Sequence, residues 1–495
     1  MKPKVSPKII RMVLITLLIF FSGNAFSSDS DESPEKTIAA LQTKIPEMMR
    51  QVDVAGLSIA IIQNSKIVWA QGFGITDYES RNQVTENTIF EAGSLSKPVF
   101  AYAVLKLIDQ GLLDIDSSLS SYLPVKYILD DQIDKVTARM VLSHTSGFPL
   151  WWPENESLKI HFAPGERFSY SSEGFVYLQN AIEAITEKPL AEFMKKQVFE
   201  PLNMTNSSYV WNDRFEKQVA FGHNQLGQEE TPWKRNMGNA ASSLLTTAGD
   251  YAKFVTAILN EDGLKPETLK EMFNPQIRLD PNCIECIDNQ PGALSESLAW
   301  GLGWGLHLSG DETLFWHWAD NLRFTSFCIA SRQSKSGVIF FTSSCNGLTL
   351  GDEIAGNIIS NVKPIFDWLK YERYDSRAMI FRQTVLKKGT AEGLTTYFEL
   401  KRSSNDRNES ISENSINELG YILLNIDRVA EAIDVFRLNV EEHPDSWNVY
   451  DSLAEAYAAQ GDKERAVNYY SIALRRVTEK NQKKRIEQMM QKLTK

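Results

Sequence analysis

The chain has 495 residues and a formal net charge of −11, which becomes −15 once the four basic residues among its first 25 are removed. A chain of this length has room for about two or three domains, each with a sizeable core. Its acidity argues against nucleic-acid binding through a general electrostatic field.

The first 25 residues have the pattern of a signal peptide. Basic residues precede an apolar run and three small residues: Lys2, Lys4, Lys8 and Arg11, then Met12 to Phe21, then Gly23-Asn24-Ala25. The run is short for a membrane span. We expect cleavage after Ala25 or Ser27, a mature chain without a transmembrane span, and a location in the periplasm or outside the cell. Residues 26–36 are expected to form a disordered linker.

Hydrophobic patterning predicts a mixed domain of helices and strands over residues 37–371. The predicted elements are a helix over 37–50, a hairpin over 56–70, a helix over 94–111, and strands over 325–329 and 337–342. Because strands lie near both ends of this region with helices between them, we expect one α+β domain closed by its first and last strands.

A helical repeat region follows this domain. Residues 411–480 contain a 34-residue repeat, in which Gly420 corresponds to Ala454 and Phe436 to Tyr470. The period and the small and aromatic positions are typical of tetratricopeptide repeats. Residues 372–410 are expected to form a helical linker, and residues 481–495 a capping helix or tail. Since concave helical arrays usually bind peptides, we expect a protein or peptide partner at the repeats.

The four cysteines do not indicate a metal site. Cys283-x-x-Cys286 has no second ligand pair, so in an exported chain it is either a local disulfide or a pair of free thiols. Cys328 lies in an apolar run and is expected to pack as a small hydrophobe. No cofactor and no metal are expected.

Ser94 and Lys97 are the most informative pair in the sequence. Residues three apart share one face of a helix, so Lys97 can reach the Ser94 oxygen. Pro98 is tolerated only in the first turn of a helix, which is therefore expected to begin at Ser94, beside unpaired backbone N–H groups. A serine there can act as a nucleophile. The pattern occurs three times in the chain, so a helix-capping serine with a solvated lysine is the alternative.

Two later segments supply further candidates. Tyr170 follows a turn and precedes an apolar helix, and a lysine ammonium beside it would lower its pKa and make it a general base. An ordinary half-buried aromatic is the alternative. His317 precedes the strand over 324–330, where an edge strand can offer a backbone N–H to an oxyanion; the alternative is a structural histidine.

Together these segments resemble the serine β-lactamase and penicillin-binding-protein superfamily, especially its class C β-lactamase-related branch of esterases and D-peptidases. The family's three motifs correspond in order to Ser94-x-x-Lys97, Tyr170-x-Ser172 and His317-x-Ala319, and Leu142 to Gly147 and Ala240 to Leu244 are further likenesses. The resemblance covers about residues 38–346. It implies a β-lactamase/DD-peptidase-like α+β fold, with an antiparallel sheet, flanking helices and a helical subdomain.

The resemblance also implies roles for single residues. Ser94 would be the acylated nucleophile, and Lys97 and Tyr170 would share its proton. His317 would orient Tyr170 or contact a substrate carboxylate. Backbone N–H groups of Ser94 and of a residue near Asp320 would form the oxyanion hole. The implied reaction is a two-step acyl transfer on an ester, amide or lactam carbonyl.

The sequence departs from the family's pattern at three positions. Ser172 replaces the usual asparagine and cannot make the same amide contacts. Ala319 replaces a glycine, and its methyl group is expected to crowd the substrate or alter the strand. Arg323 is expected to bind an anionic substrate group or to form a surface salt bridge. Trp318 is a further candidate for substrate binding.

We therefore expect an exported serine hydrolase of the esterase or D-amino-acid peptidase type, acting on a small molecule or a peptide. The alternatives are β-lactamase or penicillin-binding activity, and a catalytically weak binding protein that acts through its helical repeats. His144 is expected to be structural. Insertions at Trp151-Trp152-Pro153 and between Cys283 and Pro291 are expected to shape the pocket.

Overall fold

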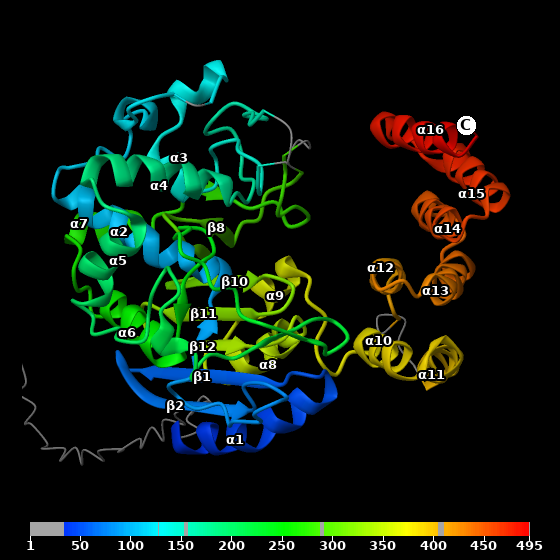
Figure 1. The fold of residues 1–495 in the computed structure, drawn as a ribbon, viewed down its shortest axis with the longest axis horizontal. Helices are drawn as coiled ribbons and strands as arrows, with labels where there is room; N and C mark the ends of the chain where they lie inside the picture. The colour runs from blue at the N-terminus through cyan, green and yellow to red at the C-terminus, as the bar shows by residue number, and fades with distance from the viewer. Residues whose placement is uncertain (1–33, 127, 153–156, 288–291, 404–409, 495) are drawn as a thin grey trace, which may run out of the picture.

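A computed structural model describes residues 34–126, 128–152, 157–287, 292–403 and 410–494. The predicted signal peptide, residues 26–33 of the predicted linker, Pro153 and Pro291 lie outside the described residues. Figure 1 shows a large unit of helices and strands, followed by an arc of helices that ends at the C-terminus. In the part of the chain that is described, no helix combines the length and the apolar character needed to cross a membrane.

An antiparallel sheet of eight strands is the centre of the large unit, in the order β2-β1-β12-β11-β10-β9-β8-β7. Its strands are β1 (Gly56–Gln63), β2 (Lys66–Gly74), β7 (Ile277–Arg278), β8 (Leu298–Trp300), β9 (Gly305–Ser309), β10 (Glu312–Asp320), β11 (Thr325–Ser331) and β12 (Ser336–Thr342). As predicted, the first hairpin pairs with the last strand, with Leu57 opposite Thr342. Two short ribbons join β3 (Phe90–Glu91) to β6 (Leu245–Thr246) and β4 (Gly222–His223) to β5 (Glu229–Glu230).

Helices cover both faces of the sheet. Along β1, Leu57, Ile59 and Ile61 pack in one core with α1, α8 and α9, whereas Ala60 and Ile62 pack in a second core with α2, α4 and α6. The helices of this unit are α1 (Pro34–Gln51), α2 (Ser96–Asp109), α3 (Ala138–Leu142), α4 (Glu173–Thr186), α5 (Leu190–Met194), α6 (Ala248–Leu259), α7 (Pro266–Met272), α8 (Gly351–Gly356) and α9 (Lys363–Leu369). Single turns are η1 (Gly93–Leu95), η2 (Leu119–Tyr122), η3 (Asp131–Lys135), η4 (Lys195–Phe199), η5 (Asp213–Phe215) and η6 (Gly347–Leu350).

The C-terminal arc consists of paired helices. They are α10 (Arg377–Lys388), α11 (Thr390–Ser403), α12 (Glu413–Asn425), α13 (Val429–Glu442), α14 (Trp447–Gln460), α15 (Lys463–Arg476) and α16 (Lys480–Thr494). The 34-residue repeat coincides with the pairs α12–α13 and α14–α15. A Cβ at Gly420 would lie 2.3 Å from the Phe436 ring, so the glycine lets α12 approach α13 closely.

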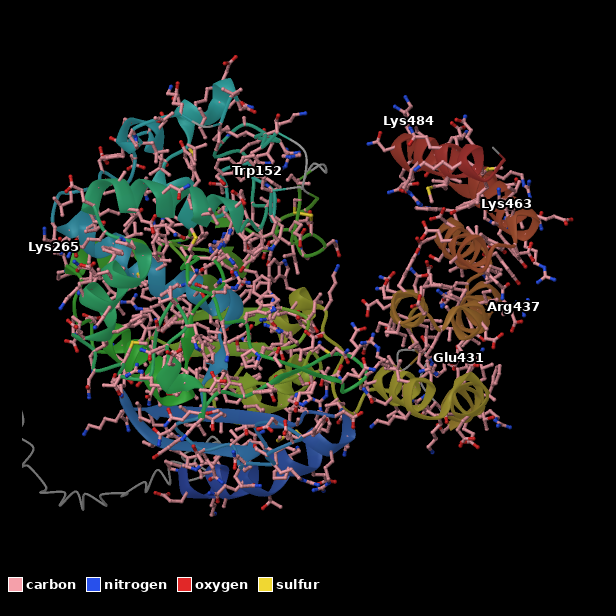
Figure 2. The ribbon with its side chains drawn as sticks, in the orientation of Figure 1. Trp152, Lys265, Glu431, Arg437, Lys463 and Lys484 are labelled. Carbon is pink, nitrogen blue, oxygen red and sulfur yellow. A yellow bond between two sulfur atoms is a disulfide. The ribbon has the colours of Figure 1, made fainter. Side chains whose placement is uncertain are left out.

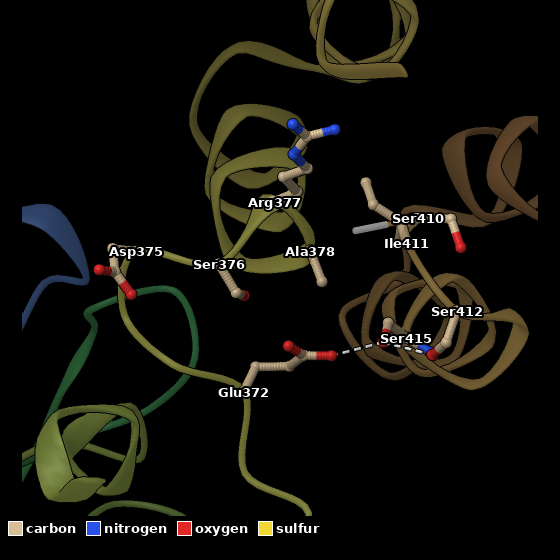
Figure 3. Close-up of a pocket in the computed structure, with 9 residues that line it drawn as sticks. All are labelled: Glu372, Asp375, Ser376, Arg377, Ala378, Ser410, Ile411, Ser412 and Ser415. Carbon is tan, nitrogen blue, oxygen red and sulfur yellow. Dashed lines mark hydrogen bonds between the residues drawn. The ribbon is translucent and has the colours of Figure 1, made fainter. Parts of the chain in front are cut away.

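A short segment after α9 joins the two units. The Glu372 carboxylate accepts a hydrogen bond from Ser415 Oγ at 2.5 Å, and Lys387 Nζ lies 2.8 Å from Asp53 Oδ2 of the large unit. Glu372, Ser376, Arg377 and Ser415 are among the residues that line a cavity of about 460 Å³ at this junction (Figure 3).

Candidate active site

Ser94 lies at the centre of a sharp turn between β3 and α2. Gly93 has a φ of +51°, which a glycine adopts readily, and so Ser94 lies in the turn η1 instead of in the first turn of α2 as predicted. From residue 91 to residue 100, Ser94 is the one position that is not fully buried. The chain therefore presents a single hydroxyl from an otherwise buried segment.

Lys97 lies next to this hydroxyl and is completely buried. Its Nζ donates hydrogen bonds to Ser94 Oγ at 2.9 Å and to the carbonyl of Ala241 at 3.0 Å. Among the described residues, no carboxylate forms an ion pair with it. Burial lowers the pKa of Lys97 well below its usual value of 10.5. The helical spacing predicted the contact with Ser94 correctly.

Tyr170 lies beside the same pair. Lys97 Nζ is 4.9 Å from the centre of the Tyr170 ring, and the ring is 5 % exposed. The expectation that the lysine lowers the pKa of Tyr170 is wrong, because burial raises that pKa and outweighs the lowering effect of the nearby Ser94 hydroxyl. Its hydroxyl has no hydrogen bond of regular geometry to any described residue. Because its pKa is raised, Tyr170 is a neutral phenol near pH 7.

His144 fixes the segment that carries Tyr170, in agreement with its expected structural role. Its Nδ1 accepts the backbone N–H of Ser171 at 3.0 Å, and its ring stacks on that of Tyr170 with centres 4.3 Å apart. Burial and the nearby Lys97 lower the pKa of His144 well below 6.5, so the imidazole is neutral. A neutral ring packed in this way positions Tyr170.

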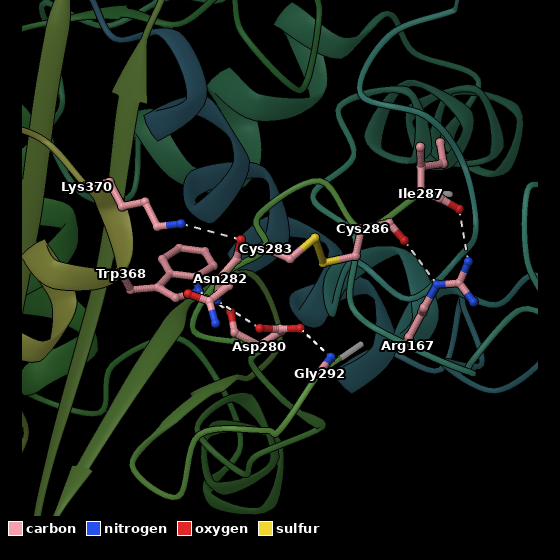
Figure 4. The surroundings of a disulfide bond; sticks show 9 residues. All are labelled: Arg167, Asp280, Asn282, Cys283, Cys286, Ile287, Gly292, Trp368 and Lys370. Carbon is pink, nitrogen blue, oxygen red and sulfur yellow. Dashed lines mark hydrogen bonds between the residues drawn. A yellow bond between two sulfur atoms is a disulfide. The ribbon is translucent and has the colours of Figure 1, made fainter. Parts of the chain in front are cut away.

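The other side of the Tyr170 segment contacts a disulfide-closed loop. Cys283 and Cys286 are bonded to each other, and between them the carbonyl of Ile284 accepts the backbone N–H of Tyr170 at 2.9 Å. Arg167 donates to the Cys286 carbonyl at 3.0 Å, as Figure 4 shows. Of the two alternatives for these cysteines, the structure therefore has the disulfide, and its loop lies against the candidate site.

His317 is fully buried in β10. Its Nδ1 lies 2.8 Å from the Trp318 carbonyl, so this nitrogen carries the hydrogen and Nε2 is left as an acceptor without a partner among the described residues. Burial, aided by Lys97, lowers the pKa of His317 to about 3. A neutral imidazole cannot pair with a substrate carboxylate. Its ring centre lies 6.0 Å from that of Tyr170. Of the two expected roles of His317, the orientation of Tyr170 is therefore the one that remains.

The end of β10 has a free edge beside Ser94. The strand was expected at the edge of the sheet, but it lies between β9 and β11. However, its pairing with β9 ends at Trp316, opposite Gly305, whereas its pairing with β11 continues to Asp320. The last residues of β10 therefore have one unpaired side. A Cβ at Gly93 would lie 3.1 Å from the Ala319 methyl group, so this end of β10 packs directly against η1.

Ala319 does not alter the strand. It lies in the continuous register of β10 with β11, opposite Ser326, and is 2 % exposed. Its methyl group packs at Gly93, which corrects the expectation of a distorted strand. The Asp320 side chain points toward the junction with the helical arc, where Oδ2 accepts a hydrogen bond from Tyr371 Oη at 2.9 Å. Asp320 can therefore contribute to the site only through its backbone.

Ser172 and Trp318 are both buried next to the Tyr170 segment. Ser172 precedes α4, is 1 % exposed, and donates its backbone N–H to the Leu150 carbonyl at 2.9 Å. The Trp318 ring packs 4.8 Å from Tyr170 and 5.7 Å from Trp368, measured between ring centres. Trp318 thus belongs to the aromatic cluster that supports Tyr170.

Arg323 forms ion pairs within the protein, and its main partner is buried. It is 3 % exposed, and its guanidinium lies 2.7 Å from Glu91 Oε1 and donates to the Thr231 carbonyl at 3.0 Å. The ion pair with Glu91 is buried, and a second carboxylate, Glu230 Oε2, which is 45 % exposed, lies 3.6 Å from the guanidinium on the surface side. Since Glu91 and a backbone carbonyl hold the guanidinium, binding of a substrate anion has no support. Glu91 is a residue that sequence reasoning missed, because its partner is 232 positions away.

Known proteins are similar to this chain in sequence. Residues 41–360 match the family model described as Beta-lactamase. Protein flp of Staphylococcus aureus (strain MRSA252) is 22% identical over 364 residues, which cover 69% of this chain and 68% of that protein. A Beta-lactamase of Pseudomonas fluorescens is 24% identical over 279 residues, which cover 54% of this chain and 74% of that protein.

Two solved structures are similar to the large unit. A class C beta-lactamase superimposes with a TM-score of 0.57 and 20% identity, covering 67% of this chain and 98% of the other. The octameric penicillin-binding protein homologue from Pyrococcus abyssi superimposes with a TM-score of 0.54 and 24% identity, covering 71% of this chain and 81% of the other. At these identities, the likeness establishes the α+β fold.

Proposed function

Because this chain belongs to the beta-lactamase family of serine hydrolases, we propose that Ser94 is the nucleophile that the substrate acylates. The observation that carries the proposal is the 2.9 Å contact between Ser94 Oγ and the Nζ of a fully buried lysine. The carbonyl carbon of an ester, amide or lactam is attacked by Ser94 Oγ, the leaving group departs, and water then releases the acid.

Lys97 takes the proton of Ser94 in this proposal. An amine whose pKa is lowered by burial has a larger neutral fraction near pH 7, and only the neutral amine can accept a proton. Tyr170, with its raised pKa, keeps its own proton and can give it to the leaving group. It regains a proton from Lys97, while Nε2 of His317 is an acceptor that can orient the phenol.

The oxyanion is held by backbone N–H groups of Ser94 and Asp320. This assignment is supported by the free side of β10 beyond Trp316 and by the packing of Ala319 at Gly93, which bring the end of the strand next to η1. Two preorganised backbone donors stabilise the tetrahedral intermediate more than the ground state.

Replacement of Ser94 by alanine tests the assignment. Ser94→Ala is expected to lower turnover of p-nitrophenyl esters by at least about 10³-fold and to abolish labelling by a fluorophosphonate probe. Ser360→Ala is the matched control, because Ser360 and Lys363 have the same spacing on an exposed segment. Turnover and labelling that persist in Ser94→Ala would remove the basis of the proposal.

We further propose that the substrates are esters or D-amino-acid peptides, with β-lactams as the alternative. Ser172, which is buried and replaces the family's asparagine, supports esters and peptides as substrates. The structural likeness to a class C beta-lactamase is the reason to test β-lactams as the alternative. Nitrocefin, short acyl esters and D-alanyl peptides, compared by kcat/KM, distinguish these substrates.

We also propose that the protein is exported and that its helical arc binds a protein or peptide. The Cys283–Cys286 disulfide supports export, because disulfides persist in oxidising compartments. The coincidence of the 34-residue repeat with α12–α13 and α14–α15 supports tetratricopeptide-like repeats. A partner captured by the full chain, but not by a variant with a disrupted α12–α13 pair, would support the second role.

A further inference from the structure

Glu91 is a buried carboxylate that the proposed mechanism does not use. It lies in β3, three residues before Ser94, and is 7 % exposed. Its Oε1 accepts a hydrogen bond from the Arg323 guanidinium at 2.7 Å, and its Oε2 accepts one from the Asn321 side-chain amide at 3.1 Å. Both donors belong to the turn between β10 and β11, which follows Asp320. One carboxylate therefore connects the segment of the nucleophile to the end of β10.

The hydrogen bonds of β10 determine where the backbone N–H of Asp320 points. The N–H of Asn321 donates to the Phe324 carbonyl at 3.1 Å, on the side of β11. Backbone N–H groups of successive residues in a strand point to opposite sides. The N–H of Asp320 therefore points to the other side of β10, where the pairing with β9 has already ended at Trp316. This direction makes it available as one of the two donors to an oxyanion.

The turn after Asp320 depends on side-chain hydrogen bonds for its shape. Leu322 has a φ of +68°, in the left-handed region that is unfavourable for a residue with a side chain, and it is 72 % exposed. Burial therefore contributes little to holding it there. Asp320 Oδ1 accepts the N–H of Leu322 at 2.9 Å, and Asn321 Oδ1 accepts the N–H of Phe324 at 2.7 Å. Because the Asn321 amide also donates to Glu91, the carboxylate fixes the side chain that shapes this turn.

We propose that Glu91 is a positioning residue that fixes the distance between the two backbone donors of the oxyanion hole, the N–H groups of Ser94 and Asp320. The inference rests on the proposed function and deepens it. Glu91 is three residues from the first donor, and its partners Asn321 and Arg323 are one and three residues from the second. Without this clamp of Glu91, Asn321 and Arg323, the turn and the end of β10 can move relative to η1. Two donors that no longer converge on one oxygen stabilise the tetrahedral intermediate less.

The chemistry of the clamp is suited to fixing geometry. Apolar residues of the same volume often stabilise a protein core at least as well as a buried ion pair does, so stability is a weak reason for this one. Further hydrogen bonds anchor both of its members: Trp233 donates its backbone N–H to Glu91 Oε1 at 3.0 Å, and the Thr231 carbonyl accepts from Arg323 at 3.0 Å. Charge-assisted hydrogen bonds are short and directional, so they hold the segments that they join in one arrangement.

A pair of p-nitrophenyl esters tests the proposal, one with a carbonyl oxygen and one with sulfur in its place. Sulfur accepts backbone hydrogen bonds poorly, so an oxyanion hole favours the oxygen ester, and we expect a wild-type ratio of the two kcat/KM values of about 10² or more. Asn321→Asp keeps the oxygen that accepts the Phe324 N–H and replaces the donor to Glu91 by a second carboxylate. We expect it to lower kcat for the oxygen ester about 20-fold, to leave KM within about threefold, and to lower the ratio about tenfold.

Glu91→Gln changes the other partner of the same hydrogen bond, and the double variant Glu91→Gln/Asn321→Asp is the rescue. In the double variant, donor and acceptor are exchanged, because the new amide at position 91 can donate to the new carboxylate at position 321. Each single variant should lower the ratio about tenfold, and the double variant should return it to within about threefold of the wild-type value. Loss of stability alone would not change the ratio, because both esters are measured on the same preparation.

Glu431→Gln is the matched control. Figure 2 labels Glu431 in the helical arc, where its carboxylate pairs with the Arg428 guanidinium at 2.5 Å and accepts the backbone N–H of Thr390 at 3.1 Å. This variant therefore loses the same kinds of contact as Glu91→Gln, but in the other unit of the molecule. We expect kcat, KM and the ratio to stay within about twofold of the wild-type values.

An unchanged ratio in Asn321→Asp and Glu91→Gln would overturn the proposal, as would a double variant that stays at the level of the single ones. A wild-type ratio near one would also overturn it, because no oxyanion hole would then discriminate oxygen from sulfur. If Ser94→Ala abolishes turnover and the ratios do not change, the clamp alone is wrong. If Ser94→Ala still turns over esters, the nucleophile assignment and the clamp fail together.

Discussion

In the proposed mechanism, the surroundings of Lys97 determine how Ser94 loses its proton. Its amine is enclosed between the Ser94 hydroxyl, the Ala241 carbonyl and the rings of Tyr170 and Phe175. A buried ammonium without a carboxylate partner is destabilised, so the neutral amine is favoured. Burial acts in the opposite direction on Tyr170 and keeps its proton in place. In the proposed mechanism, burial alone therefore makes Lys97 the base and Tyr170 the acid.

This separation predicts how activity depends on pH. Only the neutral form of Lys97 accepts the Ser94 proton, so kcat/KM for an ester should fall about tenfold per unit as the pH drops below the lowered pKa of Lys97. The limb should lie well below pH 10.5. His317 cannot cause it, because its pKa of about 3 keeps it neutral throughout.

The variant His317→Gln separates these two groups. We expect a lower rate if the imidazole orients Tyr170, but the same midpoint of the acidic limb in a pH–rate profile. A midpoint that moves or disappears in His317→Gln would show that the histidine, and not Lys97, is the group that titrates.

The residues of the site were predictable only where the signal is local. Helical spacing predicts the contact between Ser94 and Lys97, and the turn that contains His144 predicts the structural role of this histidine. The Ala241 carbonyl, the pairing of Glu91 with Arg323 and the burial of Tyr170 depend on tertiary packing. Burial decides the pKa of Tyr170, which is why its expected direction was wrong.

At the scale of elements, the disulfide-closed loop supports the Tyr170 segment. The Ile284 carbonyl holds the Tyr170 amide from one side, while His144 holds the adjacent Ser171 amide from the other. The sheet itself was predicted at its first and last strands, where apolar alternation is long. The short strands β7, β8 and β9 lack such alternation, so their pairing beside β10 was not predictable from the sequence.

We expect the double variant Cys283→Ser/Cys286→Ser to lower kcat/KM for esters by about fivefold. The Ile284 carbonyl would then hold Tyr170 less firmly, while Ser94 and Lys97 stay in place. The loop between the cysteines is short, so the loss of stability should not exceed about 2 kcal/mol. Cys345→Ser, at a cysteine that forms no disulfide, is the control. An unchanged kcat/KM, measured beside the thermal midpoint, would contradict a positioning role for the loop.

At the scale of the whole molecule, two units have largely separate cores. The hydrolase unit packs around both faces of its sheet, whereas α11 to α16 pack among themselves. α10 connects them, because Met379 packs in the hydrolase core and Phe381 in the helical one. The chemistry of Ser94 should therefore not depend on the integrity of the distant repeats.

The variant Gly420→Val tests this independence. A Cβ at this position would lie 2.3 Å from the Phe436 ring, and so the larger side chain forces α12 away from α13. We expect the helical arc to lose about 2–3 kcal/mol of stability, with an earlier first transition in calorimetry, while ester turnover at 25 °C stays within about twofold. Gly249→Ala, where the nearest atom to a new Cβ is 3.9 Å away, is the control. A parallel loss of ester turnover in Gly420→Val would mean that the repeats hold the active site in shape.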